Sequence, residues 1–208
     1  MGVTYDSDMG EDALELLRRV FGAAHAQAPG GISIEVGTRR GGSALLFLTA
    51  LEELYPDPRP LFLTVDPYGN KPYLAGSYAI EGTYGAAEYL AAKSALDAFP
   101  NHAHFLLEDH DFWSRMPGVR LWSAGRPMLL GQGEGRISFV LLDGDHDAVS
   151  VLFGIKGAIP LMHPRGVIVV DNIDKATGVD GLLPPHQRWR GREAELAILT
   201  PDRQGLAL

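Results

Sequence analysis

The chain has 208 residues, and its hydrophobic share of 46% and charged share of 21% are those of an ordinary folded protein rather than a disordered one. Its formal net charge of −8 disfavours a protein that grips nucleic acid, because that task needs clustered Lys and Arg. It contains no cysteine, which excludes disulfides, thiolate metal ligands and cysteine nucleophiles.

The polar and acidic start of the chain, residues 1–11, lacks the basic and apolar regions of a secretion signal. No apolar stretch has the length of a bilayer span, so we expect a cytoplasmic protein with no membrane partner. A chain of this length can bury its core in one domain, and we expect a single domain over residues 1–208. Apolar residues at helical spacing predict an N-terminal helix within residues 1–28.

Beyond this helix, short apolar runs alternate with helical patterns along most of the chain. Strands are predicted at residues 32–36, 61–65, 104–107, 137–142 and 167–170, and helices at residues 43–54, 86–99 and 149–162. Two glycine-containing stretches between them, residues 67–84 and 115–136, are predicted to be variable insertions. Near the C-terminus, residues 195–199 and 204–208 flank a turn and predict an antiparallel hairpin.

Short apolar strands separated by helices predict a parallel sheet that is covered by helices on both faces. We therefore expect an α/β fold with a Rossmann-like, doubly wound, mostly parallel sheet and an antiparallel C-terminal hairpin. In such sheets ligands bind at the carboxyl ends of the strands, where the strand order reverses. Four of the five strands end on an acidic residue or on a glycine turn beside one, so the sequence predicts a ligand site at that edge.

The first strand ends in a glycine-containing loop, residues 35–43, that leads into a helix. Gly37 and Gly41 let the backbone approach a ligand closely, and the helix start offers free amides. The loop lacks the Gly-Lys-Ser/Thr of a phosphate-binding loop and the three-glycine spacing of dinucleotide sites. Glu35 and Asp66 line it with acids, which suits a cationic sulfonium, and Asp66 could accept hydrogen bonds from a ribose diol. The alternative is that both glycines only permit a tight turn and that Asp66 caps it.

A second pair of acids follows the fourth and fifth strands. Asp143 and Asp171 end strands that are predicted neighbours, roughly 4.8 Å apart. Two carboxylates this close either share a proton or recruit a cation, and Asn172 adds a neutral oxygen ligand. Such hard oxygen ligands suit Mg²⁺ or Ca²⁺. The alternative is that both acids are helix caps at strand ends.

Here the sequence resembles a known family. Residues 35–43 resemble the first motif of class I S-adenosylmethionine (SAM)-dependent methyltransferases, and Asp66 falls where that family carries its ribose-binding acid. Residues 142–146 and 164–172 resemble the small-molecule O-methyltransferases that use a divalent cation, of the catechol, caffeoyl-CoA and macrolide-sugar types. The resemblance spans residues 31–174.

This resemblance implies SAM as cofactor and a divalent cation, with Mg²⁺ the expected ion, bound by Asp143, Asp171 and Asn172. His146 stands where the catechol-type enzymes carry a lysine and the macrolide-sugar enzymes a histidine proposed as base. An imidazole with an ordinary pKa of about 6.5 suits proton transfer at neutral pH. Asp109 follows the third strand, where the family contacts adenine. The residues implied in SAM binding are Glu35, Gly37, Thr38, Gly41, Ser43, Asp66, Asp109 and Asp143.

The function expected from this resemblance is the metal-assisted O-methylation of a small hydroxylated molecule, with no nucleic acid as partner. Two alternatives stay open at this point. One is a metal-dependent oxygenase on the same fold, since the chain also resembles cephalosporin-hydroxylase-like relatives. The other is a non-catalytic scaffold that binds the cofactor. The sequence leaves the oligomeric state open and is compatible with a homo-oligomer.

Overall fold

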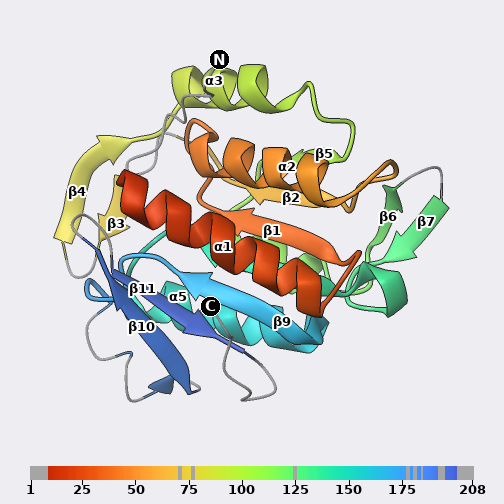
Figure 1. The fold of residues 1–208 in the computed structure, drawn as a ribbon. Helices are drawn as coiled ribbons and strands as arrows, with labels where there is room; N and C mark the ends of the chain where they lie inside the picture. The colour runs from red at the N-terminus through yellow and green to blue at the C-terminus, as the bar shows by residue number, and fades with distance from the viewer. Residues whose placement is uncertain are drawn as a thin grey trace.

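A seven-stranded sheet forms the centre of the protein (Figure 1). The computed structural model describes residues 9–69, 72–75, 78–123, 126–176, 179, 182–183, 185–191 and 195–200. The strand order is β10-β11-β9-β8-β1-β2-β5. The strands from β9 to β5 in this order run parallel, and β11 and β10 complete the sheet in antiparallel fashion. This is the predicted mostly parallel α/β fold, so the fold class is confirmed.

The helices and strands follow the predicted order, with unpredicted additions in the two insertions and at α4 and β10. The main strands are β1 (Ile32–Val36), β2 (Phe62–Val65), β5 (His102–Phe105), β8 (Ile137–Leu142), β9 (Met162–Val170), β10 (His186–Arg190) and β11 (Glu195–Leu199). The α-helices are α1 (Glu11–Gln27), α2 (Gly42–Leu54), α3 (Ala86–Leu96), α4 (Asp109–Arg115) and α5 (Ala148–Ala158), and the short 3-10 turns are η1 (Gly133–Gly135) and η2 (Ile159–Leu161). The insertions contain two further hairpins, β3 (Pro72–Ala75) with β4 (Tyr78–Thr83) and β6 (Arg120–Ser123) with β7 (Arg126–Leu129).

The C-terminal hairpin differs from the prediction in its partner strand. The predicted strand at residues 195–199 is β11, but in the structure it pairs with β10, which precedes it in the chain. Residues 204–208, the expected partner, lie outside the described residues. Glu195 of β11 receives hydrogen bonds from Arg188 and Arg190 of β10, and these ion pairs tie the two strands together.

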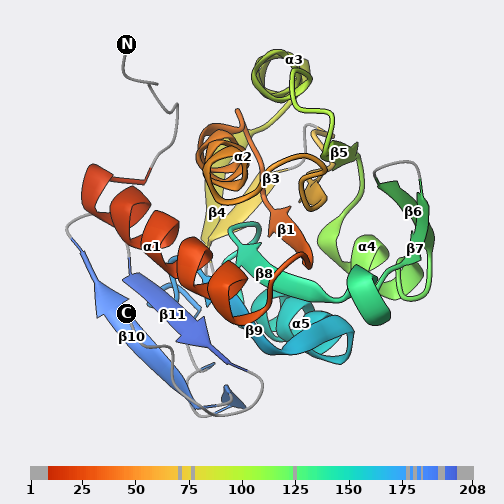
Figure 2. The ribbon, with the colours of Figure 1, turned by 45° about the vertical axis from the view of Figure 1, so that its right-hand side comes forward.

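Helices cover both faces of the sheet (Figure 2). α1 and α2 pack on one face and α4 and α5 on the other, so the buried side chains form two apolar clusters. On the α1 face, Phe21 stacks on Phe47 with ring centroids 4.8 Å apart and meets Phe139 of β8 edge-on at 5.0 Å. Every residue of β1 and β8 is buried; β8 is almost entirely apolar, whereas β1 also buries the polar Ser33 and Glu35. No helix in the described part of the chain has the length and apolar content of a membrane span.

The strand order reverses at β1, which lies between β2 and β8. Doubly wound sheets bind ligands at such a point, beyond the carboxyl ends of the strands. Here the register puts Val36 beside Leu142, and Leu142 beside Val170. The residues that follow these three strand ends therefore start from the same level of the sheet.

At the opposite end of β1, His25 of α1 is buried in a polar network. Its Nε2 lies 2.8 Å from the Ser33 hydroxyl and its Nδ1 lies 3.0 Å from the Tyr55 hydroxyl, which also accepts a hydrogen bond from the Gly30 amide. Only 2% of His25 is exposed, and burial lowers its pKa to about 4. The folded protein therefore holds this imidazole in its neutral form.

This burial predicts a loss of stability in acid. The unfolded chain takes up a proton on His25 below about pH 6.5, whereas the folded chain takes it up only near pH 4. Between pH 6.5 and pH 4, His25 should therefore lower the free energy of unfolding by about 1.4 kcal/mol for each unit of decrease in pH. Urea unfolding measured at several pH values across this range should show that the free energy of unfolding of His25→Gln depends less steeply on pH by that amount.

A matched control separates titration from the loss of hydrogen bonds. Tyr55→Phe also breaks the network but keeps the imidazole, so its unfolding free energy should retain the wild-type dependence on pH. An unchanged slope in His25→Gln would contradict the assignment.

Candidate functional site

The glycine loop between β1 and α2 rests directly on the end of β8. Gly37 has a positive φ of 87°, and a Cβ built on it would lie 2.0 Å from the carbonyl oxygen of Asp143. Gly41, at the start of α2, has a φ of 84°. Both positions therefore require glycine, the first because of a close backbone contact as well as its conformation. The loop and the acid-bearing end of β8 form one continuous surface.

Asp66, at the end of β2, holds this loop in place. Its Oδ2 accepts hydrogen bonds from the amides of Thr38 at 3.1 Å and Arg39 at 2.9 Å, and its Oδ1 accepts one from the Tyr68 amide at 3.0 Å. Burial raises the pKa of Asp66 although these three bonds oppose the shift. The structure thus gives Asp66 a role in shaping the loop, and its predicted contact with a ribose stays a prediction.

Glu35 lies in β1 below the loop and is fully buried. Ser43 Oγ donates a hydrogen bond of 2.5 Å to Glu35 Oε1. Among the described residues, neither Glu35 Oε2 nor the buried hydroxyl of Thr38 has a hydrogen-bond partner. Burial raises the pKa of Glu35 to about 8, with a further contribution from the charge of Asp66, so this carboxyl is largely protonated at neutral pH. The loop and the strand below it therefore each contain a buried oxygen that no described residue hydrogen-bonds.

The acids after β8 and β9 converge as predicted. Asp143, His146 and Asp171 each place one ligand atom so that these atoms lie within 4.8 Å of one another. Burial raises the pKa of Asp171 and, together with the neighbouring charge of Asp171, raises that of Asp143 well above its ordinary value. Asp171 Oδ1 is buried and has no hydrogen-bond partner among the described residues. The pair consequently needs a shared proton or a cation to compensate its charge.

Asn172 and His146 complete this group, which we call the acid cluster together with Asp143 and Asp171. Asn172 has a positive φ of 49°, a conformation that asparagine tolerates better than most residues. Its Nδ2 donates to Asp171 Oδ2 at 2.6 Å and lies 3.3 Å from His146 Nε2. His146 Nε2 is 3.8 Å from Asp143 Oδ1. The structure therefore brings the predicted metal ligands and the predicted base together.

His146 is held as a neutral imidazole. It is only 2% exposed, and burial lowers its pKa to about 3, with a smaller contribution from the positive charge of Lys175. Its Nε2 faces both the Asp143 carboxylate and the Asn172 amide. This nitrogen could accept a proton, as predicted, or could itself serve as a metal ligand.

Asp109 stands apart from the acid cluster in its contacts. It occupies the first turn of α4, and its Oδ1 accepts a 2.5 Å hydrogen bond from the amide of His110. Burial raises its pKa. No contact given by the described residues joins it to the glycine loop, and its predicted contact with adenine stays a prediction.

Two residues gain roles that sequence reasoning did not assign. Tyr68, which falls in the first predicted insertion, is buried, and its hydroxyl donates a 2.5 Å hydrogen bond to the carbonyl oxygen of Arg39. Lys175 was not named from the sequence. Its positive charge opposes part of the rise in the pKa values of Asp143 and Asp171. Its position three residues after Asn172, in the turn that follows β9, was the available signal.

The sequence model of a family described as a methyltransferase domain matches residues 34–173, which is more than half of the chain. The matched range begins in β1 and ends just after the acid cluster, and so includes the glycine loop. The chain therefore belongs to this methyltransferase family, as its resemblance predicted. None of the curated proteins compared with the chain matches it in sequence.

Solved structures support the same fold. TomG, an O-methyltransferase of tomaymycin synthesis from Streptomyces achromogenes solved with SAM, is similar at a TM-score of 0.59 and 14% identity, over 92% of this chain and 81% of TomG. The calicheamicin methyltransferase CalS11 is similar at a TM-score of 0.65 and 16% identity, over 91% of this chain and 78% of CalS11. An O-methyltransferase from Bacillus cereus solved with SAH is similar at a TM-score of 0.57 and 13% identity, over 94% of this chain and 83% of that enzyme. At these identities the likeness shows the class I methyltransferase fold.

The contact between Gly37 and β8 generates a prediction for stability. Gly37→Ala forces a Cβ against the Asp143 carbonyl and a non-glycine residue into a positive φ, which should lower the free energy of unfolding by about 1–3 kcal/mol. Gly22→Ala, in the middle of α1 with no atom within 4 Å of the new Cβ, is the matched control and should stabilise the protein by up to about 1 kcal/mol. Urea unfolding of both variants measures the difference, and equal effects would refute the close contact.

Proposed function

We propose that the protein is a SAM-dependent methyltransferase that methylates a hydroxyl group of a small molecule with the help of a divalent cation. One observation carries this proposal: Asp143, His146 and Asp171 place their ligand atoms within 4.8 Å of one another beside the glycine loop. Membership of the methyltransferase family supports the reaction, and the acid cluster supports the assistance by a metal.

The glycine loop has the features that a SAM site needs. Gly37 lets the loop lie directly against the Asp143 carbonyl, and Glu35 Oε2 and Thr38 Oγ1 are buried oxygens that no described residue hydrogen-bonds. A cationic sulfonium is favoured in such surroundings, since Asp66 and the acid cluster add negative charge nearby. The similar structures of TomG and the Bacillus cereus enzyme were solved with SAM and SAH, which supports this cofactor.

The acid cluster fits a divalent cation. Asp171 Oδ1 is a buried carboxylate oxygen that has no hydrogen-bond partner among the described residues, and a metal ion would compensate it. Asp143, Asp171 and Asn172 are the residues that would hold the ion, and their oxygen atoms suit Mg²⁺. When bound, such an ion lowers the pKa of a coordinated hydroxyl group.

The chain's own residues then position and deprotonate the acceptor. His146 Nε2 would accept the proton of the acceptor hydroxyl, and SAM, when bound, would supply the methyl group to the acceptor oxygen and leave as SAH. The imidazole is neutral and lies 3.3 Å from the Asn172 amide, but burial lowers its pKa to about 3, which makes it a weaker base than an ordinary histidine in this state. Alignment of two bound reactants contributes much of the acceleration in such transfers. The names of TomG and CalS11 support a small-molecule acceptor.

One alternative function is favoured by the imidazole of His146. A nitrogen ligand among carboxylates suits iron better than magnesium, and a metal-dependent oxygenase on this fold would use it. The two functions differ in the metal and in their need for dioxygen. Metal analysis of the purified protein, with turnover measured in air and under nitrogen, separates them.

Calorimetry with SAM, with and without Mg²⁺ and with a chelator, tests the main proposal. SAM should bind in each condition, and methyl transfer from labelled SAM to a panel of phenols and sugars should need the metal. Transfer in the presence of chelator would overturn the metal assistance, and the absence of SAM binding would overturn the methyltransferase function.

Asp171 should be essential for transfer but not for SAM binding. Because Asp171→Ala removes a predicted metal ligand, it should lower turnover at least about a hundredfold while calorimetry shows SAM affinity largely kept. Asp174→Ala, which removes an exposed acid three residues later, is the matched control and should keep turnover. Wild-type turnover in Asp171→Ala would remove this residue from the reaction.

His146 should act on the proton rather than on the metal. His146→Gln should lower kcat by about 10²–10⁴-fold. Binding of Mn²⁺, followed by electron paramagnetic resonance as a probe of the cation site, should stay within a few-fold of wild type. Loss of Mn²⁺ binding would instead make His146 a metal ligand and would favour the oxygenase.

A further inference from the structure

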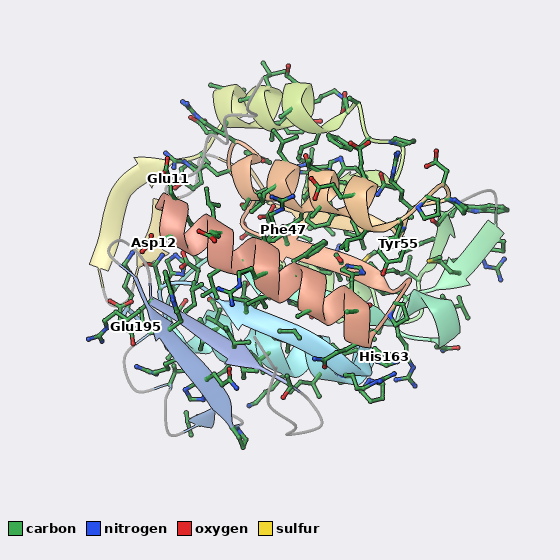
Figure 3. The ribbon with its side chains drawn as sticks, in the orientation of Figure 1. Glu11, Asp12, Phe47, Tyr55, His163 and Glu195 are labelled. Atoms are coloured by element: carbon green, nitrogen blue, oxygen red, sulfur yellow. The ribbon has the colours of Figure 1, made fainter. Side chains whose placement is uncertain are left out.

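A second hollow lies at the opposite end of the sheet from the acid cluster. It has a volume of about 250 Å³ and is formed where β1, β2, β8 and β9 begin. Figure 3 shows Tyr55 and His163, which both line it, at this end of the molecule. β1 separates the two ends with five residues, which is roughly 16 Å. This cavity is therefore distinct from the site of the proposed reaction.

The cavity is basic in a protein that is acidic as a whole. Three basic side chains from separate parts of the chain line it, namely Arg59 before β2, Arg136 before β8 and His163 in β9. No Asp or Glu is among its lining residues in the described part of the chain. In a chain with a formal net charge of −8, a cavity lining with two guanidinium groups and no described carboxylate differs from the protein as a whole, although Glu52 and Asp57 pair with Arg59 outside this lining.

Arg136 forms no ion pair with a carboxylate of the described residues. Its Nη1 donates a 3.0 Å hydrogen bond to the carbonyl oxygen of Met162, and within the described ranges it has no carboxylate within 4.0 Å. The pKa of His163 is lowered by its partial burial and by the charges of Arg165 and Arg136, which indicates a positive environment. His163 Nδ1 accepts a hydrogen bond from the Arg165 amide, so the neutral ring carries its proton on Nε2 as a donor.

Arg59 contributes a donor that the fold leaves unused. Its Nη1 lies 3.3 Å from Glu52 and 3.5 Å from Asp57, both exposed carboxylates. Its Nε is buried and has no hydrogen-bond partner among the described residues. A buried charged donor without a partner is costly, and an acceptor group in the cavity would remove this cost.

We propose that this cavity binds a small oxyanion, a phosphate or carboxylate group that is free or carried by a metabolite. Guanidinium groups recognise such anions through charge-assisted hydrogen bonds. The volume is below that of typical pockets for drug-sized ligands, which restricts the enclosed part of the ligand to a group of a few atoms. This binding is independent of the methyl transfer, because it uses the amino ends of the strands.

Calorimetry and thermal unfolding with three probes test the proposal at constant ionic strength. Inorganic phosphate, acetate and adenosine monophosphate distinguish a free phosphate, a carboxylate and a phosphate carried by a metabolite. At least one should bind at millimolar concentration and raise Tm above the value in sodium chloride. Arg136→Met and Arg59→Met should each weaken that binding at least about tenfold. Arg115→Met, which removes an exposed guanidinium on α4, is the matched control and should bind as wild type does.

The outcomes divide cleanly. Loss of anion binding in both cavity variants, with retention in Arg115→Met and no competition by SAH, supports the oxyanion site. Binding that survives both cavity substitutions, competition by SAH, or no response to any probe beyond that of chloride overturns it. Because Arg136 also holds the Met162 carbonyl, a failure of Arg136→Met to fold leaves Arg59→Met and the SAH competition to decide.

Discussion

The register between β1, β8 and β9 is the constraint on which the rest of the candidate site depends. The amide of Asp143 donates to the Val36 carbonyl at 2.8 Å, and the amide of Asp171 donates to the Leu142 carbonyl at 2.9 Å. These two bonds extend the parallel ladders one residue beyond the strands and fix the start of each following loop. A slip by one residue would turn every side chain of a strand to the other face of the sheet. Gly37 would then meet a different atom, and the acids would no longer converge.

The convergence of the Asp143 and Asp171 carboxylates is unfavourable for the stability of the fold. Taking Asp143 and Asp171 out of water near each other disfavours their charged forms, and the raised pKa values express this cost. Folds keep such arrangements where a ligand or reaction needs them, since apolar residues of similar volume would be at least as stable. The two apolar clusters on either side of the sheet supply the stability that permits it. The acid cluster is thus better explained by binding than by folding.

Much of this could be predicted from the sequence, for reasons that differ between elements. β1 and β8 were predicted with their observed bounds because both are short segments rich in apolar residues, and glycine follows shortly after each. The acid cluster was predicted because its members directly follow such strands. The hairpins of the insertions were not, because β6 and β7 are four-residue strands outside the main sheet, and Trp122 is 67% exposed, so no periodic apolar signal marks them.

Other features depend on tertiary contacts that a linear pattern does not contain. The pairing of β11 with β10 depends on ion pairs from Arg188 and Arg190 to Glu195, which only the folded hairpin brings together. The bonds from the loop amides to Asp66 depend on the direction of backbone groups next to Gly37 and Arg39, which both have a positive φ. The basic cavity combines residues from four separate connections and has no signature in the sequence.

The attachment of the glycine loop to Asp66 also bears on the thermodynamics of ligand capture. Ordering a backbone residue costs about 1–2 kcal/mol of conformational entropy, and a disordered loop would incur that cost upon each encounter with a ligand. Here one carboxylate of the fold itself restrains the amides of Thr38 and Arg39. The entropy cost of ordering the loop is therefore included in the free energy of folding. Ligand binding then needs little rearrangement of the loop, so a larger part of the contact energy remains as affinity.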